Sequence, residues 1–189
     1  MASVPNYYVS PEEYLALERK AEFKSEYMDG VVYAFAGGSP LHNLIVANLI
    51  ITLGGQLKGR ACRVYPSDLR IRIPNAKRFF YPDVSVVCGA NEFADDEQDV
   101  ILNPTLIVEV SSESTAAFDR GKKFLSYQQI GSLQEYLLVS QDEILVEAYT
   151  RQGNDTWLYT KVAGREGKLT LPSIECELAL VDIYDKTGN

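Results

Sequence analysis

A glutamate in the middle of an apolar run most needs a chemical explanation. Glu109 lies inside the run LIVEV, whose neighbours predict a strand covered on both faces. A carboxylate buried without a partner is costly, so such a group usually binds a metal, meets a cation or is protonated. The structural alternative is an internal salt bridge from Glu109 to an arginine or lysine.

Asp83 is a second carboxylate that could share a metal ion with Glu109. It follows Tyr81-Pro82 at the head of the apolar run from Val84 to Val87. By itself Pro-Asp is also a common turn pair. Beside a glutamate in a neighbouring strand, it becomes half of a site for Mg²⁺, which prefers one or two carboxylates with waters and substrate phosphate oxygens. The backbone carbonyl of Val110 is the third expected ligand, and Mn²⁺ could substitute for Mg²⁺.

The site also needs a cation, and the helix expected from about Asp119 to Ile130 offers Lys122 and Lys123. At about 100° per residue, Lys123 shares the side of Tyr127 and Ile130, which faces the sheet, whereas Lys122 is turned roughly a quarter circle outward. Lys123 is therefore the better candidate. The alternative is a lysine whose stem covers apolar surface while its amine reaches water.

The elements that position these residues begin with a helix and a hairpin. The segment Ser10-Pro11-Glu12-Glu13 predicts a helix start with a capping box, and the helix is expected to run to about Lys20. Two strands, Glu26-Tyr27 and Val31 to Phe35, are expected to form a hairpin with its turn at Asp29-Gly30.

A second helix is expected after Gly37-Gly38-Ser39-Pro40, from about Leu41 to Lys58. It is apolar almost all round, which predicts that it is largely buried. Leu69, Ile71 and Ile73 then alternate with Arg70 and Arg72, a pattern that predicts a strand with one apolar and one basic face. A turn at residues 74–77 leads into the run from Phe79 to Val87, so a second hairpin is expected.

The second half of the chain predicts the sheet that carries Glu109. An acidic loop over residues 92–99 precedes the strand at residues 105–110, and the helix at 119–130 leads to a strand from Glu135 to Ser140. This order predicts a right-handed crossover between parallel strands. Strand-like runs near 144–150, 156–162 and 168–171 predict an antiparallel extension. The expected fold class is α/β or α+β, with a mixed sheet flanked by helices.

The charge of the chain is unevenly distributed. The formal net charge is −8, but the segment from Lys58 to Arg78 holds seven basic residues and one acid, Asp68, which leaves a net charge of −14 on the remainder. A local basic face on an acidic protein is compatible with a polyanionic substrate, and Arg70 and Arg72 are expected to contact backbone phosphates. The alternative is a solvated strand face balanced by acids from elsewhere.

Length and composition place the chain among ordinary folded proteins. Its 189 residues, 46% of them hydrophobic, are expected to form one domain spanning residues 1–189. No signal peptide or membrane span is expected. The three cysteines, Cys62, Cys88 and Cys176, are far apart and form no CxxC pair. Their pattern argues against a disulfide framework and a structural zinc site, and favours a cytoplasmic protein.

Four segments together resemble the Uma-two family of restriction-endonuclease-like proteins, within the PD-(D/E)XK nuclease superfamily. They are SEYMDGVVYAFAGGSPLHN, YPDVSVVCG, NPTLIVEVSSEST and DRGKKFLSYQQIGSLQEYLLV, and the resemblance extends from about Tyr8 to Tyr184. It implies a nuclease fold in which the lysine usually found two residues after the glutamate, here Ser111, has migrated to the following helix. It also implies that Glu26 joins Asp83, Glu109 and Lys123.

The chain departs from the usual family run in three places. Ser111 and Glu113 replace a more typical leucine and proline, and Lys122 stands where an acid is common. None of these changes removes an implied catalytic group. Three further residues have ambiguous roles and are not assigned to catalysis: the single histidine, His42, near a helix start, Asp68 in a turn, and Asp119, which is expected to cap its helix.

These features favour a Mg²⁺-dependent endonuclease that cleaves nucleic acid, with DNA as the expected substrate. Glu26 would orient water or a second ion. By analogy with small nucleases that make two cuts with two sites, a homodimer is expected. The alternative is a catalytically idle DNA-binding or assembly module on the same fold. A third hypothesis, a purely structural domain, predicts that Glu109 is paired with an arginine and faces no open cleft.

Overall fold

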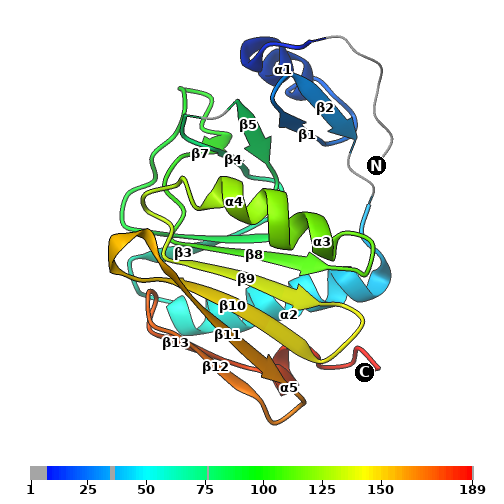
Figure 1. The fold of residues 1–189 in the computed structure, drawn as a ribbon, viewed down its shortest axis with the longest axis vertical. Helices are drawn as coiled ribbons and strands as arrows, with labels where there is room; N and C mark the ends of the chain where they lie inside the picture. Colours follow the sequence, from blue (N-terminus) through cyan, green and yellow to red (C-terminus); the bar gives the residue numbers. More distant parts are fainter. Residues whose placement is uncertain (1–7, 35–36, 76, 189) are drawn as a thin grey trace.

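The computed structural model describes residues 8–34, 37–75 and 77–188, and its centre is a six-stranded mixed sheet (Figure 1). The strand order is β11-β10-β9-β8-β6-β3. In chain order these strands are β3 (Cys62–Pro66), β6 (Val84–Cys88), β8 (Leu106–Ser111), β9 (Glu135–Ser140), β10 (Leu145–Arg151) and β11 (Trp157–Ala163). The long helix α2 (Pro40–Leu57) covers one face of this sheet, and a shorter helical segment at residues 116–127 covers the other.

The predicted crossover is confirmed. β8 and β9 pair in parallel, with Glu109 opposite Leu138, and the helical segment connects them. Every residue of β8 is buried, as its apolar run predicts for a strand covered on both faces. The other strand pairs of this sheet are antiparallel, including the expected extension through β10 and β11. The mixed α+β fold class is therefore as predicted from the sequence.

A smaller five-stranded sheet packs above the helical segment in Figure 1. Its order is β2-β1-β5-β4-β7, with β1 (Ser25–Met28), β2 (Val31–Ala34), β4 (Arg70–Arg72), β5 (Arg78–Phe80) and β7 (Val100–Ile101). The predicted hairpin is confirmed for the described residues, because Asp29 and Gly30 both take positive φ angles between β1 and β2, as a tight hairpin turn requires. Phe35, the expected end of the second strand, lies outside the described residues.

The first helix, α1 (Pro11–Glu18), begins as the sequence predicts and ends two residues earlier than Lys20. The hydroxyl of Ser10 accepts a hydrogen bond from the Glu13 amide, and the Glu13 carboxylate accepts one from the Ser10 amide. This reciprocal pair satisfies two amides that the helix leaves without partners.

The prediction that the second helix is largely buried is wrong. Ser39 caps α2 through the amide of His42, but only one stripe, formed by Ile45, Leu49, Leu53 and Leu57, is buried, and Ile51 is 71% exposed. By length and composition α2 is apolar enough to cross a membrane, and a helix that packs one face on a protein core passes the same test. Its buried stripe belongs to the core of the six-stranded sheet.

The predicted helix at residues 119–130 forms with different boundaries. Helical structure begins at α3 (Ala116–Phe118), continues through a π-helical turn, η1 (Asp119–Lys123), and ends with α4 (Phe124–Tyr127). Asp119 therefore lies inside the helical segment, and the prediction that it caps the helix is wrong. The wider π turn is a feature that sequence periodicity does not reveal, and such turns frequently occur at functional sites.

The predicted second hairpin is only partly correct. β4 and β5 pair antiparallel, but the run from Phe79 to Val87 is divided between two sheets, because Tyr81-Pro82-Asp83 breaks it before β6 begins. Proline donates no backbone hydrogen bond, so a break here is physically reasonable. As a result Asp83 stands at the junction of the two sheets.

The prediction from the cysteine pattern is also corrected. Cys62 and Cys88 face each other across β3 and β6 and form a disulfide, while Cys176 is free and buried. The two cysteines are 26 residues apart in sequence, so their proximity follows from strand register and not from a local motif. This pair removes the cysteine argument for a reducing compartment.

The chain ends with a two-stranded sheet and a short helix beside α2. β12 (Lys168–Leu171) pairs with β13 (Cys176–Ala179), and α5 (Leu180–Ile183) follows. The sequence predicted β12 but neither β13 nor α5. Both contribute to the aliphatic core on the α2 side of the large sheet.

Candidate active site

The predicted site residues converge on the amine of Lys123, between the two sheets. Its Nζ atom lies 3.0 Å from Oε1 of Glu26, 3.1 Å from Oε1 of Glu109 and 3.9 Å from Oδ1 of Asp119. Each of these residues, and Asp83, is at most 5% exposed. We refer to Glu26, Asp83, Glu109, Asp119 and Lys123 as the acid cluster.

Strand alternation directs Glu109 into this cluster. Val108 and Val110 pack with the α2 stripe, whereas Ile107 packs among the aromatic residues under α4, so Glu109 points to the α4 side. There its Oε1 accepts a hydrogen bond of 2.8 Å from the hydroxyl of Tyr127 in addition to the contact with Lys123. The helical position of Lys123 beside Tyr127 is the arrangement that the sequence predicts.

Asp83 reaches the cluster from the head of β6. Val84 is paired with Val108, so one step further along the antiparallel register Asp83 stands opposite Glu109, on the same side of the sheet. Its Oδ2 accepts a hydrogen bond of 2.7 Å from the amide of Val110, which fixes the carboxylate against β8. The two acids predicted to share an ion are therefore neighbours.

Glu26 comes from the smaller sheet. It lies on β1, and its Oε1 accepts a hydrogen bond of 3.3 Å from the amide of Tyr81, two residues before Asp83. The same oxygen contacts Lys123. Glu26 thus ties the hairpin of the small sheet to the break that carries Asp83 and to the helical segment.

Two residues that were not assigned from the sequence belong to this site. Nε2 of His42 lies 3.1 Å from Oδ1 of Asp83, and a Cβ atom on Gly38 would stand 2.5 Å from the His42 ring, so the glycine leaves room for the imidazole. Asp119 faces Lys123 from four residues earlier in the chain. The only available sequence signals were the position of His42 at a helix start and this i, i+4 spacing.

The electrostatics of the cluster reflect four carboxylates gathered around one ammonium. Burial raises the pKa of Glu109 well above its usual value, and the charges of Asp83, Asp119 and Glu26 raise it further against the opposing effect of Lys123. Burial would lower the pKa of Lys123, but the surrounding carboxylates hold it well above its usual value. The carboxylates therefore favour the charged form of Lys123, whereas burial and their mutual repulsion disfavour the charged form of Glu109.

The donor atoms of the cluster fit a hard divalent cation. Asp83 and Glu109 offer carboxylate oxygens, and such a cation would offset the repulsion among the neighbouring carboxylates. Lys123 and Tyr127 both donate to Oε1 of Glu109. Among the described residues no group of three or more His, Cys, Asp or Glu side chains is arranged to hold a metal ion. Mg²⁺ typically uses an open set of one or two carboxylates.

The burial of Arg70 corrects the predicted basic face of β4. Arg70 is 4% exposed, forms an ion pair with Asp99 and lies over the ring of Tyr81, so it is not positioned at the surface to contact phosphate. Arg72, two residues later, is exposed. The alternation predicted from Arg70 and Arg72 fails because Arg70 lies in the contact between β4 and the acidic loop.

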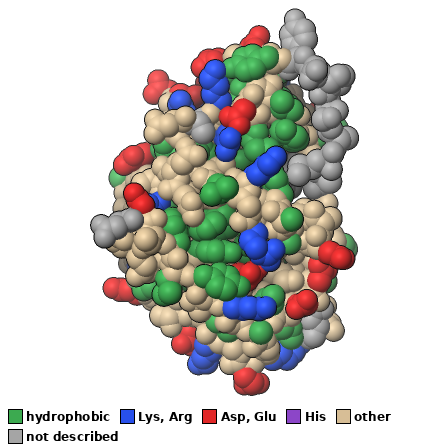
Figure 2. Space-filling model, in the orientation of Figure 1, with side chains coloured by type: hydrophobic (Ala, Val, Ile, Leu, Met, Phe, Trp, Pro, Cys, Tyr) green, Lys and Arg blue, Asp and Glu red, His purple; other side chains and the backbone are tan. Residues whose placement is uncertain are grey.

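Other basic residues of the segment from Lys58 to Arg78 are also neutralised by acids from elsewhere. Arg60 pairs with Glu175, and Arg78 pairs with Asp29. On the face shown in Figure 2, acidic and basic side chains are interspersed and do not gather into one basic surface. The alternative of basic residues balanced by acids from elsewhere therefore describes Arg60, Arg70 and Arg78.

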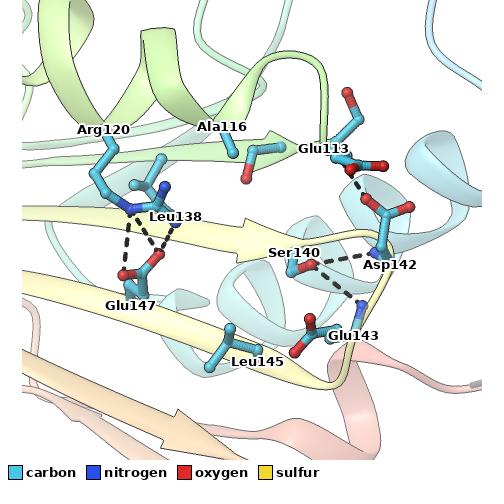
Figure 3. Close-up of a pocket in the computed structure, with 11 residues that line it drawn as sticks. Glu113, Ala116, Arg120, Leu138, Ser140, Asp142, Glu143, Leu145 and Glu147 are labelled. Atoms are coloured by element: carbon cyan, nitrogen blue, oxygen red, sulfur yellow. Dashed lines mark hydrogen bonds and ion pairs between the residues drawn. The ribbon is translucent and has the colours of Figure 1, made fainter.

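A separate cavity of about 330 Å³ lies on the other side of the helical segment from the small sheet (Figure 3). Arg120 of η1 extends toward Glu147 of β10 and forms an ion pair with it, while Glu113, Asp142 and Glu143 line the opposite end. The cavity contains none of the acid-cluster residues, so it is distinct from the candidate site.

Comparison with known proteins identifies the family. Residues 11–181 match the Uma2 family, described as "Putative restriction endonuclease", and the chain belongs to this family. It is similar to two uncharacterized proteins of Synechocystis sp. (strain ATCC 27184 / PCC 6803 / Kazusa). It is 39% identical to sll1609 over 83% of this chain and 89% of that protein. It is 38% identical to slr1290 over 96% of this chain and 94% of that protein.

A solved structure supports the fold. A crystal structure described as a "putative nuclease belonging to DUF820" from Anabaena variabilis ATCC 29413 superposes with a TM-score of 0.76. The match covers 95% of this chain and 99% of that chain at 21% sequence identity. At this identity the likeness establishes the shared fold.

Proposed function

We propose that this protein is a metal-dependent endonuclease that hydrolyses phosphodiester bonds in nucleic acid, with DNA as its substrate. The observation that carries the proposal is the acid cluster, in which Asp83 and Glu109 adjoin across two strands beside the buried ammonium of Lys123. The family description and the nuclease of similar fold agree with this activity.

In the proposed reaction water attacks phosphorus, the bond to the leaving sugar oxygen breaks, and that oxygen takes up a proton. Asp83, Glu109 and the Val110 carbonyl would hold Mg²⁺ or Mn²⁺. When bound, the ion supplies Lewis-acid activation of the phosphate and of water. Lys123 would offset negative charge that develops on the phosphate, and Glu26, held by the Tyr81 amide, would help to orient the attacking water.

Tyr127 and His42 act as positioning residues in this proposal. The hydroxyl of Tyr127 donates a hydrogen bond to Oε1 of Glu109, and His42 contacts Oδ1 of Asp83, so each fixes one carboxylate. Arg72 is the exposed residue proposed to contact a backbone phosphate. Because cleavage of both strands of a duplex needs two sites, we also propose that two copies act together.

The test is cleavage of supercoiled and linear DNA by the purified protein with Mg²⁺ or Mn²⁺. Asp83→Asn and Glu109→Gln are expected to abolish cleavage, as is excess chelator. Glu135→Gln is a matched control, because Glu135 is a buried carboxyl of the neighbouring strand β9 that lies outside the cluster. Cleavage that survives both cluster substitutions or the chelator would rule out this site.

The burial of the cluster favours a second candidate, a binding or assembly module without catalysis. All four acidic residues are at most 5% exposed, and Lys123 contacts the carboxylates of three of them directly. Calorimetry with Mn²⁺ separates the two candidates. The endonuclease is expected to bind the ion in a manner that Asp83→Asn abolishes, whereas an idle site is expected to release no carboxylate-dependent heat.

A further inference from the structure

A groove lies between the β1–β2 hairpin and the helical segment at residues 116–127. Its volume is about 380 Å³. One wall is formed by Met28, Val31 and Tyr33 of the hairpin, and the other by Lys122 and Leu125 of the helical segment. Figure 2 shows this face, where hydrophobic side chains and separate Lys or Arg side chains lie between the hairpin and α4.

None of the acid-cluster residues lines this groove, but the register of the hairpin places it beside Glu26 of the candidate active site. Glu26 is paired with Tyr33, and Met28 with Val31. Side chains two residues apart on a strand share a face, so Tyr33 and Met28 lie on the face of the hairpin that carries Glu26. On the opposite wall Lys122 directly precedes Lys123. A ligand in the groove would therefore extend away from the cluster.

The groove has fixed walls and one uncompensated positive charge. Arg78 joins the two walls, because it pairs with Asp29 of the hairpin turn and donates a hydrogen bond of 2.8 Å to the hydroxyl of Ser126 on α4. This pairing neutralises Arg78. Lys122 is exposed, and among the described residues no acid forms an ion pair with it, although the chain has a net charge of −8.

The remaining lining is apolar and aromatic. Leu125 is 63% exposed, and Met28, Val31 and Tyr33 are partly exposed. A duplex presents phosphates, sugars and base edges, and it hides the faces of its bases in the stack. An unpaired strand offers base faces that can cover apolar and aromatic side chains, and phosphates that can meet a lysine.

We propose that this groove binds an unpaired stretch of the nucleic-acid substrate next to the phosphate that is cleaved. The assignment of the ligand rests on the proposed nuclease function. Tyr33 stacks against a base, Lys122 contacts a backbone phosphate, and Met28 and Leu125 lie against the sugar and base. The protein thus prefers substrates with single-stranded segments over uninterrupted duplexes.

The experiment is fluorescence anisotropy with a labelled oligothymidylate in excess chelator, so that binding is measured without turnover. Tyr33→Leu keeps an apolar side chain and removes the ring, and it is expected to weaken binding about tenfold. Lys122→Ala is expected to reduce the slope of log K against log salt by about 0.7, as expected for one lost phosphate contact on a single strand. Lys161→Ala, at an exposed lysine on β11, is the matched control and is expected to change neither quantity.

Three results would overturn the groove assignment: unchanged binding by Tyr33→Leu and Lys122→Ala, an equal loss in Lys161→Ala, or a duplex that binds as tightly as the single strand. Lys122 and Leu125 are exposed, so Lys122→Ala and Leu125→Ser provide variants that leave the core intact. Cleavage with metal but normal binding by the groove variants rejects the groove and retains the nuclease. If the groove variants weaken binding but the wild-type protein does not cleave, the groove is retained as a binding site and the nuclease is rejected.

Discussion

The two faces of the six-stranded sheet bury different kinds of side chain. On the α2 face, the stripe Ile45, Leu49 and Leu53 packs with Val84, Val108 and other aliphatic residues of the strands. On the α4 face, rings such as Tyr127, Tyr136 and Phe80 surround the buried carboxylates and Lys123. The same strand, β8, supplies Val108 to one face and Glu109 to the other.

This difference separates what stabilises the fold from what could perform chemistry. Aliphatic packing contributes stability in proportion to the apolar area removed from water, and it needs no specific partners. Buried charges must be paired with each other, and removing one partner leaves the others uncompensated. We therefore expect substitutions on the α2 face to change stability alone, and those on the α4 face to change stability and activity together.

The largest effect is expected at the centre of the polar face, in Lys123→Met. Methionine retains most of the volume but removes the ammonium that contacts Glu26, Glu109 and Asp119. We expect the free energy of unfolding to fall by about 3–5 kcal/mol, as for other buried pairs that lose one partner, and cleavage to be lost. Urea denaturation and a DNA cleavage assay measure the two effects.

Lys161→Met is the control for Lys123→Met, because Lys161 is exposed on β11. Its stability is expected to stay within about 0.5 kcal/mol of the wild type. Mn²⁺ is expected to raise the melting temperature of Lys123→Met, since the ion can replace part of the missing positive charge. A Lys123→Met protein as stable as the wild type would show that the carboxylates do not depend on this amine.

The second prediction concerns the aliphatic face, where Leu49 is fully buried in the middle of the α2 stripe. Leu49→Ala removes methyl groups and leaves a cavity, so we expect a loss of about 3 kcal/mol in unfolding free energy. The cleavage rate per folded molecule is expected to stay at the wild-type value. A loss of rate comparable to that of a cluster substitution would break the separation between the two faces.

The third prediction, Tyr127→Phe, removes one hydrogen bond while keeping the ring. The Tyr127 hydroxyl donates to Oε1 of Glu109 at 2.8 Å, and its ring packs edge-on against Phe80. Loss of this buried donor is expected to cost about 1–2 kcal/mol of stability and to lower kcat about tenfold with little change in KM, because Glu109 loses a positioning contact.

Tyr136→Phe is the matched control for Tyr127→Phe. The Tyr136 hydroxyl is equally buried, but it donates to the backbone carbonyl of Asp119 and not to a carboxylate of the cluster. We expect a similar loss of stability with kcat largely retained. Equal losses of kcat in the two variants would indicate that the aromatic packing, and not the bond to Glu109, supports activity.

The contrast between the faces also explains which features could be predicted from the sequence. The strand alternation around Glu109 and the helical side of Lys123 follow from local periodicity, so β8, β9 and the approach of Lys123 to the sheet were predicted correctly. The role of Glu26 came only from the family resemblance. Its contact with Lys123 depends on how the small sheet packs on the helical segment.

The features that were missed depend on contacts between distant segments. The burial of Arg70 follows from its pairing with Asp99, and the contact between His42 and Asp83 joins residues 41 positions apart. The disulfide between Cys62 and Cys88 follows from the register of β3 and β6. The π turn that carries Asp119 and Lys123 departs from the 3.6-residue period on which the helix prediction relied.

The smallest effect is expected at a buried acid on the aliphatic α2 face of the sheet. Glu135 of β9 lies beside Leu137 in the pattern that faces α2, and it is 1% exposed. Its Oε2 accepts hydrogen bonds from the amide and hydroxyl of Ser173, but its Oε1 has no partner among the described residues. No described lysine or arginine forms an ion pair with Glu135, in contrast to Glu109.

Burial raises the pKa of Glu135 above its usual value of 4.5, against the opposing hydrogen bonds from Ser173 and the Thr150 side chain. Because the folded state holds this proton more tightly than the unfolded state, stability falls as pH rises from the unfolded pKa through the folded one. Glu135→Gln removes the charge and retains an acceptor for Ser173. We expect it to be more stable than the wild type at neutral pH, a gain that disappears near pH 4.5. Urea denaturation at both pH values tests this, and an equal gain at both would mean that packing, rather than an unpaired charge, is responsible.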